Sequence, residues 1–336
     1  MVYIHVKRIG DKRYYTLRVS MRKNGRIITK DLINLGDDLS TVKIEDLEKK
    51  YNKEIRKSHH VITKFLDSNH YIGLAKKLKL KEDPYLTREQ LAEIEAVRLH
   101  YTSKFLKLDK LTQKQGYDNF LINFAVNSTS IEGNTITLKE AYALFKEDTA
   151  PKKKPLRDVY DLINTRKVLN FLNENNREIT SELIIEIHDK LLENMDNRKG
   201  FRNHDIRILG QPFKPSPARY VKADVELLLK WYNQNKKKIH PLILAIFFHH
   251  KFEKIHPFSD GNGRTGRILM NHILRLADYP PFIIPRRLRR EYLEVMSEAD
   301  KSTEKDLFGV NLKEYKTLIN FIYIQFTSSY WDTFLI

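Results

Sequence analysis

Apolar and polar residues alternate along residues 2–34, and a longer repeat follows in the rest of the chain. The alternating stretch has three parts, VYIHV, RYYTLRV and RIITKDLI, which are separated by Gly10-Asp11 and Asn24-Gly25. Dipeptides of this kind connect the two strands of a hairpin. The pattern therefore predicts a small antiparallel β-meander of three strands over residues 1–37.

Helical spacing of apolar residues dominates the chain from Leu39 onward. We expect a solvated linking helix over residues 42–58 and long helices across residues 87–132, with a break near Asp109–Thr112. Further helices are expected over residues 156–175, 180–195, 222–237, 241–254, 264–277, 286–300 and 311–330. Pro151 to Pro155, with three lysines between them, should form an exposed loop.

The helical pattern is interrupted between Asp205 and Val221, where IRILG and RYV flank a proline-rich segment. This predicts a two-stranded β-hairpin inserted among helices. The fold class is therefore mainly α, with an inserted hairpin and a preceding β-meander. We divide the chain into residues 1–60, the meander and linking helix, residues 61–150, a helical region, and residues 151–336, a helical core.

Composition indicates a packed globular protein, because 41% of the 336 residues are apolar. The chain has no cysteine, which excludes disulfides, thiolate metal sites and cysteine nucleophiles. The N-terminus lacks the apolar segment of a signal peptide, and the longest apolar run, Leu242 to Phe248, is too short to span a membrane. We therefore expect a cytoplasmic protein without a membrane partner.

The net charge of +17 favours phosphates, nucleic acid or acidic protein surfaces as partners. A basic surface is necessary for nucleic-acid binding but does not demonstrate it. A nucleic-acid-binding regulator, built on this charge and on the basic meander, is therefore kept as an alternative function.

The segment His256 to Arg267, HPFSDGNGRTGR, joins an apolar helix to an amphipathic one through a short turn. Gly261 and Gly263 lack a Cβ, so their backbone can take positive φ and approach a ligand closely. N–H groups at the start of the following helix point toward phosphate oxygens, and the helix dipole supports them. The segment is thus a candidate anion site.

The other polar residues of this segment suit a nucleotide with several phosphates. Arg264 and Arg267 are three apart, so on a helix they share a face where they can bind further phosphates. Asp260 is a candidate Mg²⁺ ligand, and His256, whose usual pKa is near neutral, could accept a proton from an attacking hydroxyl.

Gly261, Gly263 and Gly266 also match the G-x-G-x-x-G fingerprint of dinucleotide-binding proteins. That fingerprint requires a preceding strand within a βαβ unit, whereas FFHHKFEKIHPF has helical character and PPFIIP is rich in proline. The dinucleotide interpretation is therefore disfavoured.

HPFSDGNGRTGR matches the Fic family signature HPFxDGNGRxxR at every fixed position, and the likeness extends from about Asn123 to Asp300. The resemblance implies a helical Fic core and AMPylation, the transfer of AMP from ATP to a Ser, Thr or Tyr hydroxyl of a protein. It also implies site roles: His256 as general base, Asp260 as Mg²⁺ ligand, Phe258 as a buried anchor, Gly261, Asn262 and Gly263 as the anion hole, and Arg264 and Arg267 as holders of the phosphate tail.

Ser128 to Gly133, STSIEG, resembles the inhibitory pattern S/T-x-x-x-E-G/N of the same family. Gly133-Asn134 is a helix-stop signal, so Glu132 lies in a last turn, where the helix dipole disfavours a carboxylate and a cationic partner would help. By resemblance, that partner is Arg267, and Glu132 blocks the place of the ATP γ-phosphate while Ser128 belongs to the inhibitory motif.

RREYLEVMSEAD resembles the family segment that lines the adenine pocket. Tyr292 keeps the family residue, whereas Leu293 and Asp300 depart from the commoner pattern. The adjacent His249 and His250 would point to different faces of a helix, which favours packing or polar support over metal binding.

Resemblance assigns the hairpin at residues 205–221 as the flap that holds the target by strand-like pairing. We interpret Arg202, which precedes it, as a structural ion-pair partner without a catalytic role.

The leading function is thus ATP- and Mg²⁺-dependent AMPylation of a target protein, or of the chain itself, restrained by Glu132. De-AMPylation, or transfer of another phosphate-containing group from the same site, is the alternative. Members of the family are often dimers, so a homodimer is left open.

Overall fold

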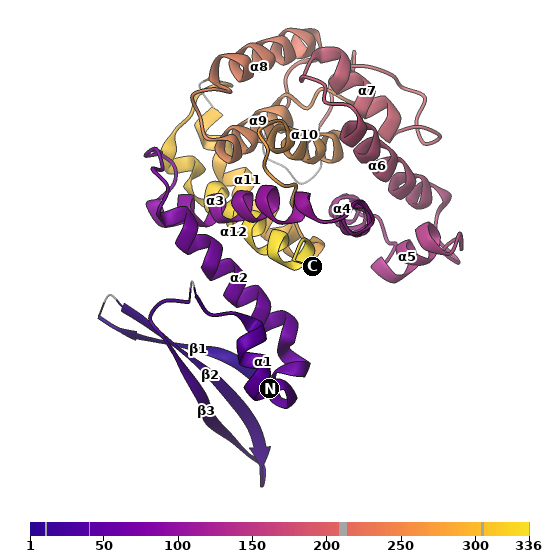
Figure 1. The fold of residues 1–336 in the computed structure, drawn as a ribbon. Helices are drawn as coiled ribbons and strands as arrows, with labels where there is room; N and C mark the ends of the chain where they lie inside the picture. Colours follow the sequence, from indigo (N-terminus) through magenta and orange to yellow (C-terminus); the bar gives the residue numbers. More distant parts are fainter. Residues whose placement is uncertain (11, 40, 208–213, 304–305, 336) are drawn as a thin grey trace. The chain divides into compact units, whose positions relative to one another are not determined.

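The computed structural model describes residues 1–10, 12–39, 41–207, 214–303 and 306–335. It forms two compact units (Figure 1). Unit 1 contains residues 1–82 and 88–107, and unit 2 contains residues 83–87 and 108–334. The functional boundaries expected near residues 60 and 150 stay predictions.

The N-terminal meander of unit 1 is confirmed. Strands β1 (Val2–Ile9), β2 (Lys12–Lys23) and β3 (Arg26–Gly36) form one antiparallel sheet in the order β1-β2-β3. Asn24 and Gly25 both have positive φ, 50° and 74°, as the tightest hairpin turns require. The Asn-Gly signal therefore placed this turn correctly.

Helices α1 (Ile44–Ile55) and α2 (His59–Lys76) cover one face of this sheet. Helix α3 (Arg88–Ser103) packs against α2 and also belongs to unit 1. The helix expected over residues 42–58 ends earlier, because a short 3-10 turn leads from α1 into α2, which was not predicted. Alternate strand residues pack on the helices in one core cluster, formed by Val2, Tyr15, Leu17, Leu39, Leu47, Ile55, Ile62 and Leu66.

Unit 2 is helical, and its predicted helices are confirmed to within a few residues. They are α4 (Lys110–Ile131), α6 (Leu156–Glu174), α7 (Ser181–Leu191), α8 (Val221–Asn235), α9 (Pro241–Ile255), α10 (Asn262–Leu276), α11 (Arg289–Ala299) and α12 (Leu312–Thr333). Helix α5 (Leu138–Lys146) was not predicted. Within the described ranges, no helix combines the length and apolar character needed to cross a membrane.

Helix α9 is the centre of unit 2, because its residues Leu242–Phe252 are buried all round. It packs against α8, α10 and α12, and Figure 1 shows α9 and α10 enclosed by the other helices of the unit. A helix that is apolar on every side belongs in a core. The loop between α9 and α10, residues 256–261, thereby starts from a rigid support.

The hairpin expected between Asp205 and Val221 is only partly within the described chain, because residues 208–213 lie outside it. The strand predicted at residues 219–221 is wrong. Ala218–Tyr220 form a 3-10 helix, and α8 begins at Val221. Pro217 cannot donate to a strand ladder, and the Ala218 N–H instead donates to the Asp205 carboxylate at 2.7 Å.

Candidate active site

The loop after α9 is held in one conformation by its own residues. His256 ends the helix in the left-handed region, with φ of 50°. Phe258 is fully buried, as predicted, and its ring stacks on His188 with centroids 3.7 Å apart. The side chain of Asn262 accepts from the Phe258 N–H at 2.9 Å and donates to its carbonyl at 2.8 Å. The Asn262 amide therefore fixes the loop.

The His256 ring is oriented by the end of its own helix. Its Nδ1 lies 3.3 Å from the Glu253 carbonyl oxygen, which only accepts hydrogen bonds. This contact assigns the proton to Nδ1 and leaves a lone pair on Nε2. Burial lowers the pKa of His256 to about 4, so the imidazole is neutral near pH 7 and can accept a proton.

Glu253 is a site residue that the sequence interpretation missed. Its carboxyl oxygens lie 3.9 Å from Nδ1 of His256 and 3.9 Å from Nδ1 of His249. Burial raises the pKa of Glu253 to about 8, which keeps the carboxyl protonated near pH 7. Its position three residues before His256, on one helical face, was the available signal.

The anion site forms at the N-terminus of α10. Gly261 has φ of 80°, as expected for a glycine at this turn. The N–H groups of Asn262, Gly263 and Arg264 precede the first backbone bond of the helix, from Thr265 N–H to the Gly261 carbonyl at 3.0 Å. Such N–H groups bind anions.

Gly263 is glycine for a different reason from the one predicted. It lies inside α10 and does not have positive φ. A Cβ at this position would overlap the Glu132 carboxylate and approach Nη1 of Arg267 to 3.0 Å. The absent side chain therefore leaves room for Glu132.

Two arginines hold the Asp260 carboxylate. One oxygen pairs with Arg157, and the other lies 3.3 Å from Nη2 of Arg264. Asp260 also lines a cavity to which residues of α9, α10 and α11 contribute. One carboxylate next to an anion site fits Mg²⁺, which uses few protein ligands and completes its shell with phosphate oxygens and water. The described residues contain no cluster of three His, Asp or Glu around a metal position.

Arg264 and Arg267 have different surroundings, although they are three residues apart on α10. Arg264 is buried and pairs with Asp161 as well as with Asp260. Arg267 points into the same cavity. Arg264 thus contacts Asp161 and Asp260 and is not among the residues that line the cavity, whereas Arg267 is.

The expected contact between the two motifs is present. Nη2 of Arg267 donates to the Glu132 carboxylate at 2.7 Å and to the Ser128 carbonyl at 2.8 Å, and Nε donates to the Ser128 hydroxyl at 3.0 Å. Burial opposes the charge on Arg267, but the Glu132 carboxylate raises its pKa above the usual value. Glu132 ends α4, and Gly133 follows with φ of 106°.

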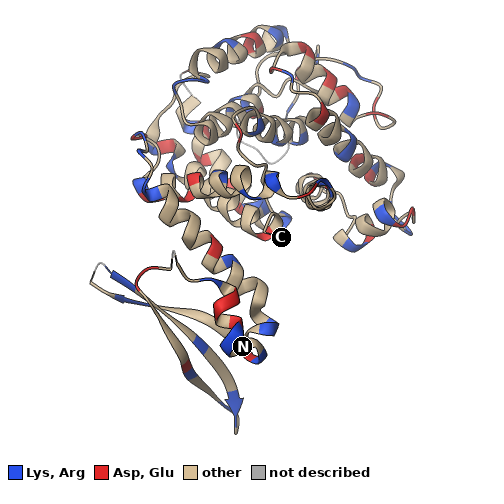
Figure 2. Ribbon diagram, in the orientation of Figure 1, with Lys and Arg blue, Asp and Glu red and all other residues tan. Residues whose placement is uncertain are grey.

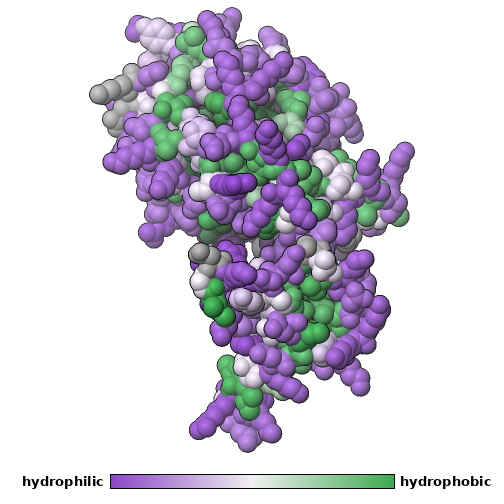
Figure 3. Space-filling view, turned by 60° about the vertical axis from the view of Figure 1, so that its left-hand side comes forward, coloured by the Kyte–Doolittle hydropathy of each residue, from purple (hydrophilic) through white to green (hydrophobic). Residues whose placement is uncertain are grey.

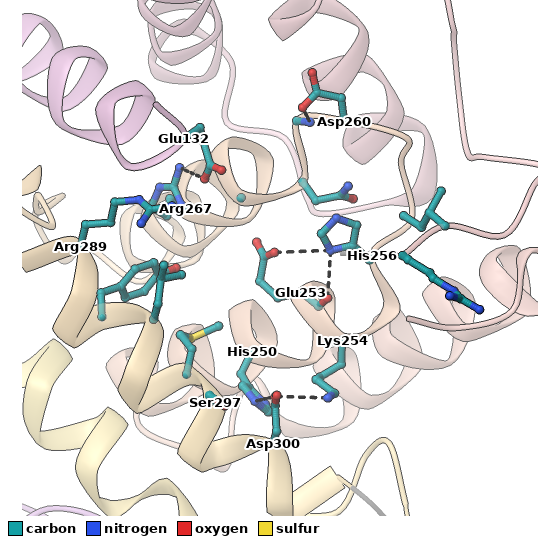
Figure 4. A pocket seen from close by; sticks show the side chains of 18 of the residues that line it. Glu132, His250, Glu253, Lys254, His256, Asp260, Arg267, Arg289, Ser297 and Asp300 are labelled. Carbon is teal, nitrogen blue, oxygen red and sulfur yellow. Dashed lines mark hydrogen bonds and ion pairs between the residues drawn. The ribbon is translucent and has the colours of Figure 1, made fainter. Parts of the chain in front are cut away.

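These residues converge on one cavity of about 570 Å³ (Figure 4). One wall carries His256, Asp260 and the start of α10, and another carries Glu132 and Arg267. The side facing them is formed by residues of α11 and its ends, Arg289, Tyr292, Leu293, Met296, Ser297 and Asp300. This volume suits a small-molecule ligand.

The predicted polar support by the two histidines of α9 is confirmed. Nε2 of His249 lies 2.5 Å from the Tyr292 hydroxyl, so this contact orients the tyrosine that lines the cavity. His250 contacts the Asp300 carboxylate at 3.0 Å, which also lies 3.2 Å from Nζ of Lys254. Asp300 therefore has a structural partner in this chain.

Arg202 is not the ion-pair partner that was predicted. Its guanidinium donates to backbone carbonyls, at 2.8 Å to His256 and at 2.9 Å to His204, and also to Ser216. Carbonyls at a helix C-terminus lack partners and attract cations, which explains the position of this arginine. It joins the end of α9 to both sides of the segment that includes residues 208–213.

Comparison with solved structures defines the class of the fold. A Fic domain containing signaling protein from Bacteroides thetaiotaomicron superposes with a TM-score of 0.65 at 24% identity, covering 70% of this chain and 94% of the other. Fic-1 from Caenorhabditis elegans, residues 134–508, gives a TM-score of 0.59 at 24% identity, covering 82% of each chain. The part of the chain that these superpositions cover thus has the Fic fold.

Sequence comparison adds a family match within unit 2. Residues 178–274 match the Fic/DOC family, so the chain carries a Fic/DOC domain. It is 31% identical over 213 residues to Protein adenylyltransferase Fic of Drosophila persimilis, covering 60% of this chain and 39% of that protein. It is 31% identical over 175 residues to Protein adenylyltransferase fic-1 of Caenorhabditis elegans, covering 50% and 34%. The chain thus spans less than half of these relatives.

Proposed function

We propose that this protein transfers AMP from ATP to a hydroxyl group of a protein target. The observation that carries the proposal is the convergence of a neutral His256, the Asp260 carboxylate and the N-terminus of α10 on one cavity. The likeness to protein adenylyltransferases of two animals supports it.

The reaction exchanges one bond at the α-phosphorus of ATP. The target hydroxyl oxygen forms a new P–O bond, the bond to the β-phosphate breaks, and pyrophosphate leaves. Nε2 of His256 takes the hydroxyl proton, because its lone pair is available while Nδ1 faces the Glu253 carbonyl. Glu253 stays neutral next to the base, so it adds no charge that would hold the proton.

The phosphates would bind at the start of α10. The N–H groups of Asn262 and Gly263 can neutralise oxygens of the α- and β-phosphates, and Arg267 can hold the γ-phosphate. Asp260 is the residue that would hold Mg²⁺, which supplies charge neutralisation at the phosphates. Tyr292 and the residues of α11 would surround the adenine.

Glu132 restrains this reaction in the proposed account. Its carboxylate occupies Arg267 at 2.7 Å, and the same guanidinium is the candidate partner of the γ-phosphate. ATP therefore has to compete with an ion pair inside the protein. Autoinhibition would be relieved when α4 ends in a residue without a carboxylate.

The reverse reaction is the second candidate, and Glu132 is the observation that favours it. Its carboxylate lines the same cavity as His256, so it could help water remove AMP from a modified target. Release of AMP from a purified modified protein, lost in Glu132→Gln, would identify this direction.

The type of residue that is modified and the oligomeric state are separate proposals. We propose a Ser, Thr or Tyr hydroxyl, including hydroxyls of the chain itself, because His256 activates only a group that has a proton to give. A homodimer and a cytoplasmic location remain predictions from the sequence.

The test compares ATP labelled at the α-phosphate with ATP labelled at the γ-phosphate. AMP transfer predicts protein labelling from the α-phosphate only, and its loss in His256→Ala. His60→Ala, a matched change at an exposed histidine of unit 1, should keep the activity. Labelling from the γ-phosphate would contradict the proposal, because it indicates a kinase.

A further inference from the structure

The end of the N-terminal sheet is a two-stranded ribbon. Met1 exchanges hydrogen bonds with Ser20, and the pairing of β1 with β2 starts at Val2 and Val19. Beyond Ser20, β2 pairs with β3 alone as far as the turn at Asn24-Gly25. Figure 1 shows this part of the sheet running past the start of β1. We call residues 20–30 the β2–β3 ribbon.

The ribbon has a strong charge of one sign. Its eleven residues, SMRKNGRIITK, contain Arg22, Lys23, Arg26 and Lys30 and no carboxylate. All four basic side chains are exposed. Figure 2 marks basic positions in blue on the strands at this end of the sheet. Lys49, in α1, by contrast has an acidic neighbour within the same helix at 2.9 Å. Among the described residues, the four ribbon cations have no such ion pair, so their charge is available to an external partner.

The ribbon also exposes apolar side chains to water, which is unfavourable unless a partner covers them. Met21 is 51% exposed, Ile27 75% and Ile28 45%. Figure 3 shows apolar atoms among hydrophilic ones at this end of the sheet. The inward residues of the core cluster stop at the level of Val19, so no helix of unit 1 covers these three. Clustered apolar exposure beside cations indicates a binding surface.

Both faces of the ribbon carry cations and apolar side chains, although three of the four cations, Lys23, Arg26 and Lys30, share one face. Arg22 lies opposite Ile27, Met21 opposite Ile28, and Lys23 opposite Arg26. Because neighbouring strand residues point to opposite faces, each face presents a cation and an apolar side chain. A membrane would contact one face only, and a second copy of the ribbon would bring like charges together. A groove of duplex DNA has phosphates along both edges, so it can contact the cations on both faces of the ribbon.

We propose that the β2–β3 ribbon binds duplex DNA by entering a groove. A two-stranded ribbon fits the major groove, which is about 12 Å wide. Arg22, Lys23, Arg26 and Lys30 contact the phosphates of the two strands, while the apolar side chains near the turn contact base edges. This binding does not depend on the AMP transfer site, because no residue of unit 2 takes part.

The experiment measures the affinity of the full chain for a fluorescent DNA duplex of about 20 base pairs at several salt concentrations. The test variant changes Arg22, Lys23, Arg26 and Lys30 to Ala. The matched control changes four exposed lysines on or next to α1 and α2 to Ala: Lys53, Lys57, Lys76 and Lys77. Both variants lose the same charge, and an unchanged thermal unfolding transition verifies that each is folded.

The ribbon variant should lose affinity at least about tenfold, and the slope of log K against log salt should flatten by about 3 to 4 for four phosphate contacts. The lysine control should change affinity by less than about threefold. Ile27→Ser with Ile28→Ser should weaken binding without changing the slope. His256→Ala should bind normally, which separates this result from the proposed enzyme activity.

Equal losses in the ribbon variant and the lysine control would overturn the proposal, because the charge would then act without a defined site. Absence of duplex binding by the unchanged protein would overturn it as well. Tighter binding to single-stranded RNA or to vesicles of anionic lipid than to the duplex would replace DNA as the partner.

Discussion

Arg267 of α10 donates a hydrogen bond of 2.7 Å to the carboxylate of Glu132, which lies 135 positions earlier in the chain. The guanidinium is buried and also bonds Ser128 twice, so the arginine end of this contact is fixed. A carboxylate and a phosphate oxygen compete for the same donor atoms. Under the proposed function, the occupation of Arg267 would therefore decide whether the cavity can accept the full triphosphate of ATP.

Removal of the Ser128 hydroxyl should release part of this restraint. Ser128→Ala removes the hydrogen bond that the hydroxyl accepts from Nε of Arg267 at 3.0 Å, while the bond to the Ser128 carbonyl stays. A hydrogen bond to a charged group contributes about 1.5–3 kcal/mol. We expect labelling from α-labelled ATP to rise, but less than in Glu132→Gly. A rate below that of the unchanged protein would contradict this role. Ser130→Ala, on the same turn of α4, is the control.

The pH dependence should report the burial of His256. Burial lowers its pKa to about 4 from a usual value of about 6.5, so the imidazole can accept a proton throughout pH 5–7. The folded state also disfavours the charged ring, so this contribution to stability is full above pH 6.5 and is lost as pH falls toward 4. We expect the AMP transfer rate of Glu132→Gly to stay nearly constant from pH 7 to 5.5. A rate that halves near pH 6.5 would contradict the burial of this base.

Arg157 should compete with magnesium for Asp260. Its guanidinium pairs with one carboxylate oxygen and is more than half exposed. Because an exposed pair contributes at most about 1 kcal/mol, Arg157→Ala should lower the Mg²⁺ concentration for half-maximal rate by up to about fivefold. Arg177→Ala, which removes the exposed partner of Glu186, should leave it unchanged. A higher magnesium requirement in Arg157→Ala would show that this arginine assists the metal.

The pair of Arg264 and Asp161 should determine the stability of unit 2. Both side chains are buried, and Asp161→Ala would leave the arginine with the more distant Asp260 alone. Loss of one partner of a buried ion pair costs about 3–5 kcal/mol. Urea unfolding should show a loss of this size, whereas Glu178→Ala at the exposed pair with Lys236 should cost at most about 1 kcal/mol. Equal losses would contradict a structural role of Arg264.

Local patterns along the chain were sufficient for the elements that they specify directly. Asn24-Gly25 predicted its turn because the required positive φ values depend on those two residues alone. The position of α9 followed from an apolar run behind a proline. Glu253 could have been found in the same way, because it lies three residues before His256 on one helix.

Contacts between distant helices could not be predicted from spacing. Arg264 and Asp161 are 103 residues apart, as are Asp260 and Arg157, and no pattern within one helix indicates which carboxylate another helix brings to it. The same limit applies to Gly263. The sequence analysis explained this glycine by a positive φ, which it does not have. Its absent Cβ accommodates Glu132, which arrives from α4. Only the family resemblance suggested that Glu132 and Arg267 meet.

The most direct test of the central claim is the rate of protein labelling by α-labelled ATP in Glu132→Gly compared with the unchanged protein. Release of Arg267 for the γ-phosphate predicts a rise of about tenfold or more, since the lost charged hydrogen bond is worth about 1.5–3 kcal/mol. The rise should disappear in the double variant with His256→Ala. A rate equal to or lower than that of the unchanged protein, in a Glu132→Gly protein that binds ATP, would contradict the account.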